Sequence, residues 1–313
     1  MTTKKPNFFI IGAAKAGTTS LYEYLKPHPQ VYFSPVKEPN YFCTDIKVNN
    51  FSDTYRKNTF LDVEGYFRKE KLEPLQLTFV REPEHYRRLF EEVSNEKAIG
   101  EASTSYLYST EAAQNIRRYQ PRAKIIAILR NPVERAFSHY QMALRYGHTD
   151  LDFAEAIKAD YNREHKGWGI SELFIELGMY YNELKRYYDM FPENQIKVLL
   201  FDNLKKNPSA TLLDCQQFLE IDVWLPETFE TFNKATIPLH KGLNKFVTKW
   251  GLKNGLKKYL PGNIQEKLKK EFFSASAQQV IPKEGADFLK DIYSDDIEKT
   301  SRLIGMDLTP WLR

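Results

Sequence analysis

A glycine-containing segment near the start of the chain, residues 8–21 (FFIIGAAKAGTTSL), constrains the fold more than any other. Four apolar residues end at Gly12, a short loop leads to a second glycine, Gly17, and residues 18–20 open a helical pattern. A strand, a glycine-rich loop and a helix N-terminus in this order place backbone N–H groups and the positive end of a helix dipole around an anion. The segment therefore predicts a strand–loop–helix unit that binds a phosphate group.

The spacing overlays the triphosphate-binding loop G-x-x-x-x-G-K-[ST], with one difference. Thr18 stands in the place of the lysine that contacts the β- and γ-phosphates in that loop. The cation of this segment stands three residues earlier, at Lys15, inside the loop. The loop is suited to a phosphorylated ligand but gives no clear indication of a triphosphate bound with Mg²⁺.

A second segment, residues 124–140 (KIIAILRNPVERAFSHY), carries another phosphate signal. Its apolar run predicts a buried strand, and Pro132 suits the first position of a following helix. Arg130 then lies at the carboxyl end of a strand, where open α/β sheets bind ligands, and Ser138 lies two turns into the helix. A guanidinium group suits a phosphate dianion because it can donate paired hydrogen bonds.

Together the two segments resemble the cofactor motifs of sulfotransferases that use 3′-phosphoadenosine 5′-phosphosulfate, and among these the carbohydrate sulfotransferases of the heparan sulfate type. The first segment resembles the 5′-phosphosulfate loop of that family, and the second resembles its 3′-phosphate motif. Further matching pieces follow in family order: KEPNYF at 37–42, GMY at 178–180, FP at 191–192 and WL at 311–312. The resemblance covers roughly residues 7–222.

The resemblance implies an enzyme that uses this donor, releases adenosine 3′,5′-bisphosphate and requires no metal. Lys15 would neutralise the bridging oxygen as the sulfuryl group departs. The residues that the resemblance implies for cofactor binding are Lys15, Ala16, Gly17, Thr18, Thr19, Ser20, Arg130, Ser138, Tyr180, Lys241 and Gly242. The implied acceptor is a hydroxyl or amine group, expected on a carbohydrate or a glycolipid, and the oligomeric state is not indicated.

Transfer to a hydroxyl or an amine needs a base near the sulfur, and Glu38 is the best candidate. It follows the second predicted strand, matches the family position of the catalytic glutamate, and has Lys37 beside it to keep its carboxylate ionised. Histidine is the alternative base. His28 lies in a Pro-His-Pro turn that it is expected to shape, His139 falls within the second predicted phosphate segment, and His165 lies in a loop.

One position departs from the family pattern. The heparan-type enzymes usually carry a lysine after the glutamate of the third strand, and here Ala102 follows Glu101. The missing cation would contact the acceptor or the sulfate. Either the acceptor is less acidic than heparan sulfate, or Lys37 or Lys166 substitutes. Glu101 is expected to contact and position other site residues rather than to act as a second acid or base.

Predicted strands alternate with predicted helices, the pattern of a parallel sheet with helices on both faces. Strands are expected at 7–11, 31–33, 98–100, 124–129 and 196–201, and helices at 18–25, 111–119, 132–145, 171–190 and 208–219. Residues 44–77 are expected to form an irregular insertion near the site, and no strand is expected after residue 222. The predicted fold class is an α/β, P-loop-like parallel sheet flanked by helices. It forms one domain over 1–313, with its core at about 7–222 and a helical part at about 223–313.

Composition bears on the binding partners, the state of the cysteines and the location of the protein. The 313 residues include 45 Lys and Arg against 41 Asp and Glu, a net charge of +4 that does not indicate a nucleic-acid partner. Cys43 and Cys215 lack metal-ligand spacing and are expected to be reduced core thiols. The first strand begins almost at the N-terminus, and no apolar run approaches the roughly 18 residues of a spanning helix. A cytoplasmic location is therefore expected.

The segment at 234–270 is rich in lysine and contains one acidic residue, Glu266. Within it, His240-Lys241-Gly242 resembles the family loop that closes over the 3′-phosphate of the cofactor. The amphipathic stretch behind this loop is expected to pack its apolar side on the domain. Peripheral contact with a membrane surface or an anionic glycan is the alternative.

Two other function classes stay open. A P-loop kinase or NTPase would use residues 12–19 and hold Mg²⁺ at Asp202, which ends the run KVLLFD. Against this class stand the missing loop lysine and the absence of a role for Arg130 and Ser138. A non-catalytic module that binds anionic glycans would need only the lysine-rich segment and would not require the phosphate loop.

Overall fold

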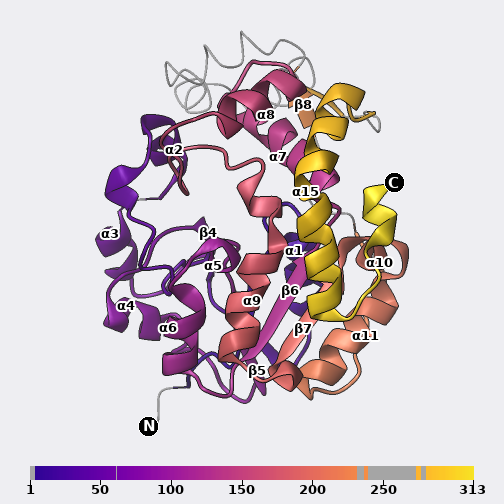
Figure 1. Ribbon diagram of the computed structural model, residues 1–313. Coiled ribbons are helices and arrows are strands. Elements are labelled where there is room, and N and C mark those ends of the chain that lie inside the picture. Colours follow the sequence, from indigo (N-terminus) through magenta and orange to yellow (C-terminus); the bar gives the residue numbers. More distant parts are fainter. Residues whose placement is uncertain (1–3, 61, 231–235, 239–272, 276–279) are drawn as a thin grey trace.

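A computed structural model describes residues 4–60, 62–230, 236–238, 273–275 and 280–313 of the chain. Its centre is a five-stranded sheet in the order β2-β5-β1-β6-β7 (Figure 1). Every pairing between these strands is parallel, so the predicted α/β fold class is confirmed. The strands are β1 (Phe8–Gly12), β2 (Val31–Phe33), β5 (Ala98–Ala102), β6 (Lys124–Leu129) and β7 (Ile196–Leu200).

Successive side chains of the central strands enter two hydrophobic clusters, one on each face of the sheet. In β1, Phe9 and Ile11 belong to the larger cluster, whereas Phe8 and Ile10 belong to the smaller one. β6 alternates in the same way. Parallel strands that are covered on both faces have continuous apolar sequences, and this makes β1 and β6 recognisable before the fold is known.

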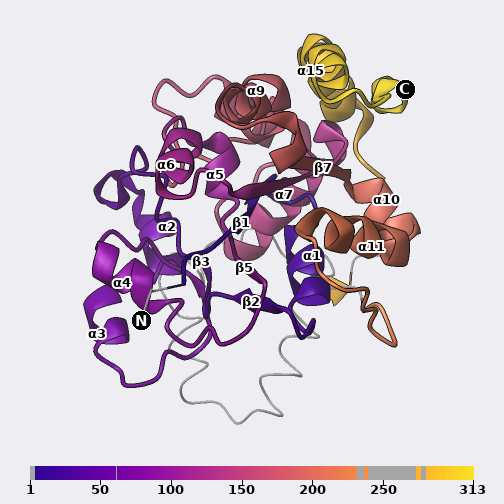
Figure 2. The same cartoon turned by 90° about the horizontal axis from the view of Figure 1, so that it is seen from below.

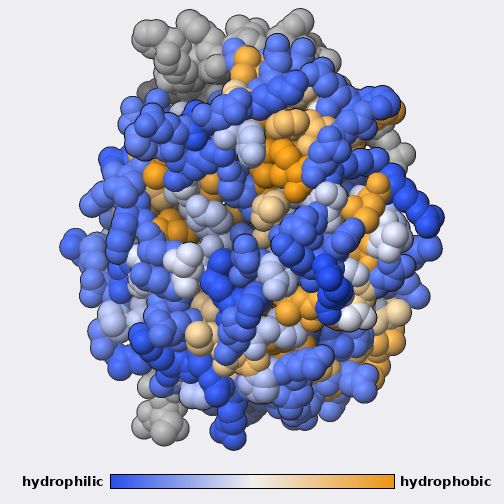
Figure 3. Space-filling model, in the orientation of Figure 1, coloured by the Kyte–Doolittle hydropathy of each residue, from blue (hydrophilic) through white to orange (hydrophobic). Residues whose placement is uncertain are grey.

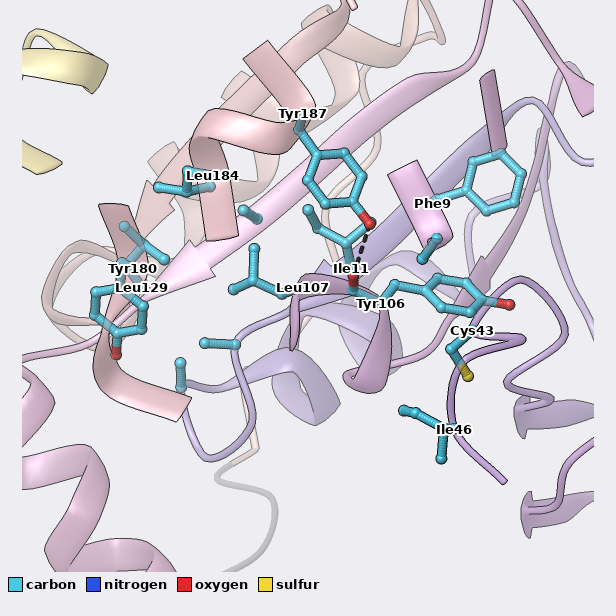
Figure 4. Packing of buried hydrophobic residues seen from close by; sticks show 14 of the residues in the cluster. Phe9, Ile11, Cys43, Ile46, Tyr106, Leu107, Leu129, Tyr180, Leu184 and Tyr187 are labelled. Carbon is cyan, nitrogen blue, oxygen red and sulfur yellow. Dashed lines mark hydrogen bonds between the residues drawn. The ribbon is translucent and has the colours of Figure 1, made fainter. Parts of the chain in front are cut away.

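Helices cover the sheet on both sides (Figure 2). On the smaller cluster pack α1 (Thr18–Leu25) and α11 (Pro208–Leu219), and on the larger one pack α5 (Ser105–Tyr108), α6 (Ala112–Tyr119) and α9 (Tyr180–Met190). Figure 4 shows the larger cluster, in which Tyr187 and Leu184 of α9 lie close to Ile11 and Leu107. The Tyr187 hydroxyl donates a hydrogen bond to the carbonyl oxygen of Tyr106 at 2.8 Å.

Between β2 and β5 the chain forms a group of short elements at the left of Figure 1, and its buried hydrophobic residues belong to the larger cluster. It contains β3 (Val36–Glu38), α2 (Asp53–Asn58), α3 (Val63–Phe67), β4 (Leu75–Leu77) and α4 (Pro83–Arg88). β3 and β4 pair in parallel, with Glu38 opposite Leu77. The expectation of an irregular segment at 44–77 is therefore wrong in part. Elements of three to six residues are too short to produce a recognisable hydrophobic period.

The helix expected at 171–190 begins only with α9, so the first half of that prediction is wrong. Asp160, at the end of α8 (Phe153–Tyr161), accepts hydrogen bonds from the amides of Glu172 and Phe174 at 3.1 and 2.9 Å. At the start of α9, Asp296 accepts a hydrogen bond from a first-turn amide at 3.2 Å. Both partners come from other elements, so no local pattern could indicate where this helix begins.

The C-terminal part combines a helix with a small strand pair. α15 (Lys283–Ile304) packs against α9 and α8, which confirms the expected helical C-terminal part. β8 (Thr236–Pro238) and β9 (Phe273–Ala275) form an antiparallel pair, so the expectation of no strand after residue 222 is wrong. β8 also lies against α7 (Pro132–Tyr146). Strands of three residues give no alternation that a sequence pattern can detect.

The visible surface is mainly hydrophilic, with small apolar patches between helices (Figure 3). Within the described ranges, no helix combines the length and the apolar character that crossing a membrane requires. Cys43 and Cys215 are buried and free, as expected. Burial raises the pKa of these thiols to about 11 and about 12, so both stay protonated and unreactive near neutral pH.

Candidate active site

The predicted site residues meet where several strands end. The phosphate loop follows β1, Thr104 lies just beyond β5, and Arg130 directly follows β6. Glu38 is the last residue of β3, which lies against β5. Because parallel strands end at the same edge of a sheet, residues far apart in sequence come together there.

The loop between β1 and α1 has a backbone that favours glycine at two points. The φ angle is 150° at Gly12 and 98° at Gly17, and Lys15 between them has a φ of 67°. A Cβ atom on Gly17 would lie 2.6 Å from the ring of Phe201, so a larger residue would displace that ring and strain the backbone. Gly17 caps α1 without a side chain, so the first-turn amides at 18–20 stay available for an anion.

Lys15 extends from this loop to α7, where its Nζ lies 3.7 Å from the Sδ of Met142. The pKa of Lys15 is lowered from 10.5 to about 8 by burial and then by four neighbouring cations, Arg145, Arg130, Lys37 and Arg135. Several positive charges around one partly buried ammonium group create a local potential that favours an anion. Lys15 therefore marks the centre of a cationic site.

Lys37 connects the phosphate loop to the candidate base, Glu38. The buried Nζ of Lys37 donates a hydrogen bond to Oγ1 of Thr19 at 2.8 Å and lies 3.9 Å from Oε1 of Glu38. Oγ1 of Thr104 donates to the other carboxylate oxygen, Oε2, at 3.1 Å. Burial raises the pKa of Glu38, while Lys37 and the Thr104 hydrogen bond act in the opposite direction. The carboxylate is thus a stronger base than an exposed glutamate and is held in a fixed orientation.

Arg130 and Ser138 offer donors for a second anion. The Arg130 guanidinium donates to Oε2 of Glu134 from Nε and Nη2, at 3.1 and 2.9 Å, and lies 4.7 Å from the ring centroid of Phe201. The Arg130 side chain is 21% exposed, so a phosphate can reach it and compete with Glu134. Ser138 is half-buried on α7, and its hydroxyl has no hydrogen bond to another residue that the structure describes.

Three further residues predicted to bind the cofactor lie in or behind this site. Ala16 is buried within the loop, and Ser20 is half-buried in the first turn of α1. Tyr180 is buried, and its hydroxyl donates to the carbonyl oxygen of Arg130 at 2.8 Å. This contact fixes the backbone that presents the guanidinium group, and a direct contact between Tyr180 and the cofactor stays a prediction.

Lys241 and Gly242 lie outside the described residues, together with most of the lysine-rich segment at 234–270. Their expected position over the 3′-phosphate stays a prediction. The same holds for the expected contact of this segment with the domain, a membrane surface or a glycan.

The histidines lie in less suitable environments than Glu38. His28 is bonded through both ring nitrogens to backbone groups, at 2.8 and 3.0 Å, which confirms that it shapes its turn. His139 is buried beside Arg135, and burial followed by that charge holds its pKa well below the usual range. His165 is exposed in the loop after α8. Of the candidate bases, Glu38 has the direct link to the phosphate loop.

The two lysines expected to replace the missing cation of the third strand can be located in the structure. Ala102 is buried in the smaller core cluster, and burial raises the pKa of Glu101 before it to about 7. Lys166 pairs with Glu176 at 2.6 Å. Lys37 is engaged with the phosphate loop, as described above. Both lysines considered as substitutes therefore already have partners within the protein.

Asp202, the residue that a kinase would use for Mg²⁺, is exposed in the first turn of α10 (Phe201–Lys206). Among the residues that the structure describes, no three His, Cys, Asp or Glu side chains gather as metal ligands.

Several contacts of the site are not visible to sequence reasoning. Phe201 touches Gly17 and also stacks on Arg130, so it joins the two elements that are predicted to bind anions. Thr104 and Met142 likewise contact the predicted catalytic side chains. Thr104 lies just after a strand and Met142 lies almost three turns along the helix after β6, and these positions were available as a signal. Which side chains they contact depends on the packing of separate elements.

Comparison with known proteins gives a family match over most of the chain. The sulfotransferase domain family matches residues 5–250. Carbohydrate sulfotransferase 15 of Mus musculus is 25% identical over 253 residues, which cover 69% of this chain and 44% of that protein. The bifunctional heparan sulfate N-deacetylase/N-sulfotransferase 3 of Homo sapiens is 26% identical over 323 residues, covering 98% of this chain and 31% of that protein. The chain thus spans less than half the length of these curated relatives.

One solved structure matches this chain over nearly the full length of both proteins. The sulfotransferase from Alicyclobacillus acidocaldarius has 27% sequence identity and a TM-score of 0.69, and the match covers 99% of this chain and 100% of that one. The arrangement of sheet and helices is therefore that of a known sulfotransferase structure, as the sequence resemblance predicts.

The cation cluster can be tested by titration. We expect Lys15 to titrate near pH 8 in the protein without ligand, and Arg145→Gln to raise that pKa, because removing a positive neighbour favours the protonated ammonium group. Arg118→Gln removes the same charge from the last turn of α6, where Arg118 is exposed, and is the matched control. The measurement is the ¹³Cε shift of labelled lysines, assigned with Lys15→Arg. An ordinary pKa for Lys15, or equal effects of the two arginine variants, would contradict the cluster.

Proposed function

This chain belongs to the sulfotransferase domain family, and on that basis we propose that it transfers a sulfuryl group from 3′-phosphoadenosine 5′-phosphosulfate to a carbohydrate or glycolipid acceptor. The observation that carries the proposal is the chain of contacts Thr19–Lys37–Glu38, which links a helix N-terminus without a side-chain cap to a mostly buried carboxylate. An anion-binding loop joined to a base is the arrangement that group transfer to a hydroxyl or an amine requires.

Two sets of donors support a ligand with two separate phosphate groups. The first-turn amides of α1, with Lys15 and Lys37, suit the 5′-phosphosulfate. Arg130 and the hydroxyl of Ser138 suit a 3′-phosphate, the group that distinguishes this donor from ordinary adenosine nucleotides. Thr18 in place of the triphosphate lysine agrees with a donor that has no γ-phosphate.

Lys15 would act on the leaving group. The donor supplies an activated sulfuryl group, and negative charge grows on the bridging oxygen as the S–O bond breaks. A fixed ammonium group stabilises that charge without reorganisation of water. The lowered pKa of Lys15 would rise again when the anion binds, so the group is protonated when it is needed.

Glu38 would act on the acceptor. As the acceptor oxygen or nitrogen attacks sulfur, its proton passes to the carboxylate, and the electron pair of the broken S–O bond stays on the departing bisphosphate. A carboxylate with a raised pKa is a more effective base near neutral pH. Lys37 keeps it ionised, and Thr104 orients it.

The acceptor class is proposed from the relatives. By their names, one is a carbohydrate sulfotransferase and the other transfers sulfate to nitrogen in heparan sulfate. This chain matches only part of each, and neither name says which atom of a glycan this protein modifies. A glycan hydroxyl or amine is the acceptor that the proposal takes from these relatives.

Ligand-dependent stability tests the cofactor. We expect adenosine 3′,5′-bisphosphate to raise the melting temperature in the presence of EDTA, with roughly 2.7 kcal/mol of added stability at a concentration of 100 times Kd. Adenosine 5′-monophosphate should stabilise less, because it lacks the 3′-phosphate. Arg130→Gln combined with Ser138→Ala should remove this preference while the effect of the monophosphate remains. If ATP with Mg²⁺ stabilises the protein and the bisphosphate does not, the chain is a P-loop kinase or NTPase.

A substitution of the base tests the chemistry. Glu38→Gln keeps the size of the side chain but cannot take a proton, so we expect normal bisphosphate binding and a loss of transfer of roughly 10²- to 10⁴-fold. His165→Ala, which alters the rival base, should leave the rate unchanged. The measurement is transfer from ³⁵S-labelled donor to the fraction of cell glycans that the parent protein modifies.

The pH dependence of the same reaction gives an independent check. Only ionised Glu38 accepts a proton, so the parent rate should fall as pH falls through a pKa that lies above the usual range of glutamate. Near-parent transfer by Glu38→Gln, or an unchanged acid limb in that variant, would place the base elsewhere.

A further inference from the structure

One stripe of α7 stays outside the core. Most of this helix is buried, whereas Glu134, Ser138, Met142 and Arg145 are half-buried and Tyr146 is exposed. The spacing of four, four and three residues places the first four side chains along one side of the helix. This stripe continues from Arg130, which is bonded to Glu134, past the Lys15 contact at Met142.

The order of the residues in this stripe shows how the parts of the site follow one another along α7. Helix rise places Ser138 about 6 Å before Met142 and Arg145 about 4.5 Å beyond it. Under the proposed function, on which this inference rests, Ser138 lies at the 3′-phosphate and Lys15, at Met142, lies at the group that is transferred. Arg145 is therefore on the opposite side of Lys15 from the 3′-phosphate, which is the side that the acceptor occupies.

Arg145 adds a cation beyond those that the donor uses. The proposed function assigns Arg130, Lys15 and Lys37 to the phosphate and sulfuryl groups of the donor, and Arg145 has no role there. Of the neighbouring charges, that of Arg145 lowers the pKa of Lys15 most, so the two groups are close enough to repel each other. A negative group of the acceptor that lies beside both cations would be attracted to each of them.

Tyr146 places an exposed aromatic ring beside the Arg145 guanidinium. Tyr146 is 40% exposed, the Arg145 guanidinium lies 4.9 Å from its ring centroid, and Nη2 of Arg145 donates a hydrogen bond to its hydroxyl oxygen at 3.3 Å. An exposed ring can pack against the C–H face of a sugar, and the guanidinium fork beside it can pair with a carboxylate or a sulfate. Aromatic face and cation together suit an acidic sugar better than a neutral one.

We propose that Arg145 and Tyr146 form the acceptor subsite, in which Arg145 binds the carboxylate or sulfate of an acidic glycan and Tyr146 packs against its sugar ring. Arg145 supplies the acceptor cation that Ala102 does not provide. The acceptor class is then an anionic glycan rather than a neutral glycolipid head group.

The test compares two acceptor probes that differ only in charge. One is a tetrasaccharide that alternates glucuronate with N-acetylhexosamine, and the other is the same tetrasaccharide with its carboxylates reduced to alcohols. Binding of each is measured by calorimetry with saturating adenosine 3′,5′-bisphosphate, so that the cofactor site is occupied. We expect the parent to bind the acidic probe more tightly, and Arg145→Gln to weaken that binding roughly 10- to 100-fold. Arg145→Lys should retain part of it.

Arg118→Gln again serves as the matched control, because it removes an exposed arginine from the last turn of α6. It should bind the acidic probe as the parent does. Equal binding of the two probes by the parent, or parent-like binding of the acidic probe by Arg145→Gln, overturns the subsite and leaves the proposed transfer reaction intact. Failure of the parent to bind the bisphosphate overturns the proposed function itself.

Discussion

The site depends on a lysine ammonium group that the fold holds among other positive charges. Lys15 has a left-handed backbone conformation in the loop after β1, and its side chain reaches α7. Burial and four cations lower its pKa to about 8, so the unliganded protein carries electrostatic repulsion at this point. The repulsion is relieved when an anion binds. The elements packed around Lys15 therefore hold these cations in positions that suit a ligand with several negative groups.

Contacts between separate elements keep these cations in position. Phe201, directly after β7, contacts Gly17 in the loop and stacks on the Arg130 guanidinium. On the other side, Lys37 joins the loop to β3 through Thr19. The two predicted anion-binding elements and the predicted base are thus held by contacts from β3, α10 and α7. A shift of any one of these elements would disturb more than one functional group.

Much of this could be predicted from the sequence, for identifiable reasons. Strands buried on both faces are continuous apolar runs, and the predicted bounds of α1 and α11 agree with the structure. Lys15, Glu38 and Arg130 were predicted at the sheet edge because each follows or ends a strand. The start of α9, the pairing of β3 with β4 and the contacts of Thr104 depend on partners from distant segments. No local pattern carries that information.

The decisive experiment is a structure of the complex with adenosine 3′,5′-bisphosphate. We expect the 5′-phosphate at the first-turn amides of α1, within hydrogen-bond distance of Lys15, and the 3′-phosphate bound by Arg130 and Ser138. The side of Lys15 toward Arg145 should stay open for an acceptor. A bisphosphate bound in the reverse orientation, or away from the loop after β1, would contradict the assignment of both anion sites.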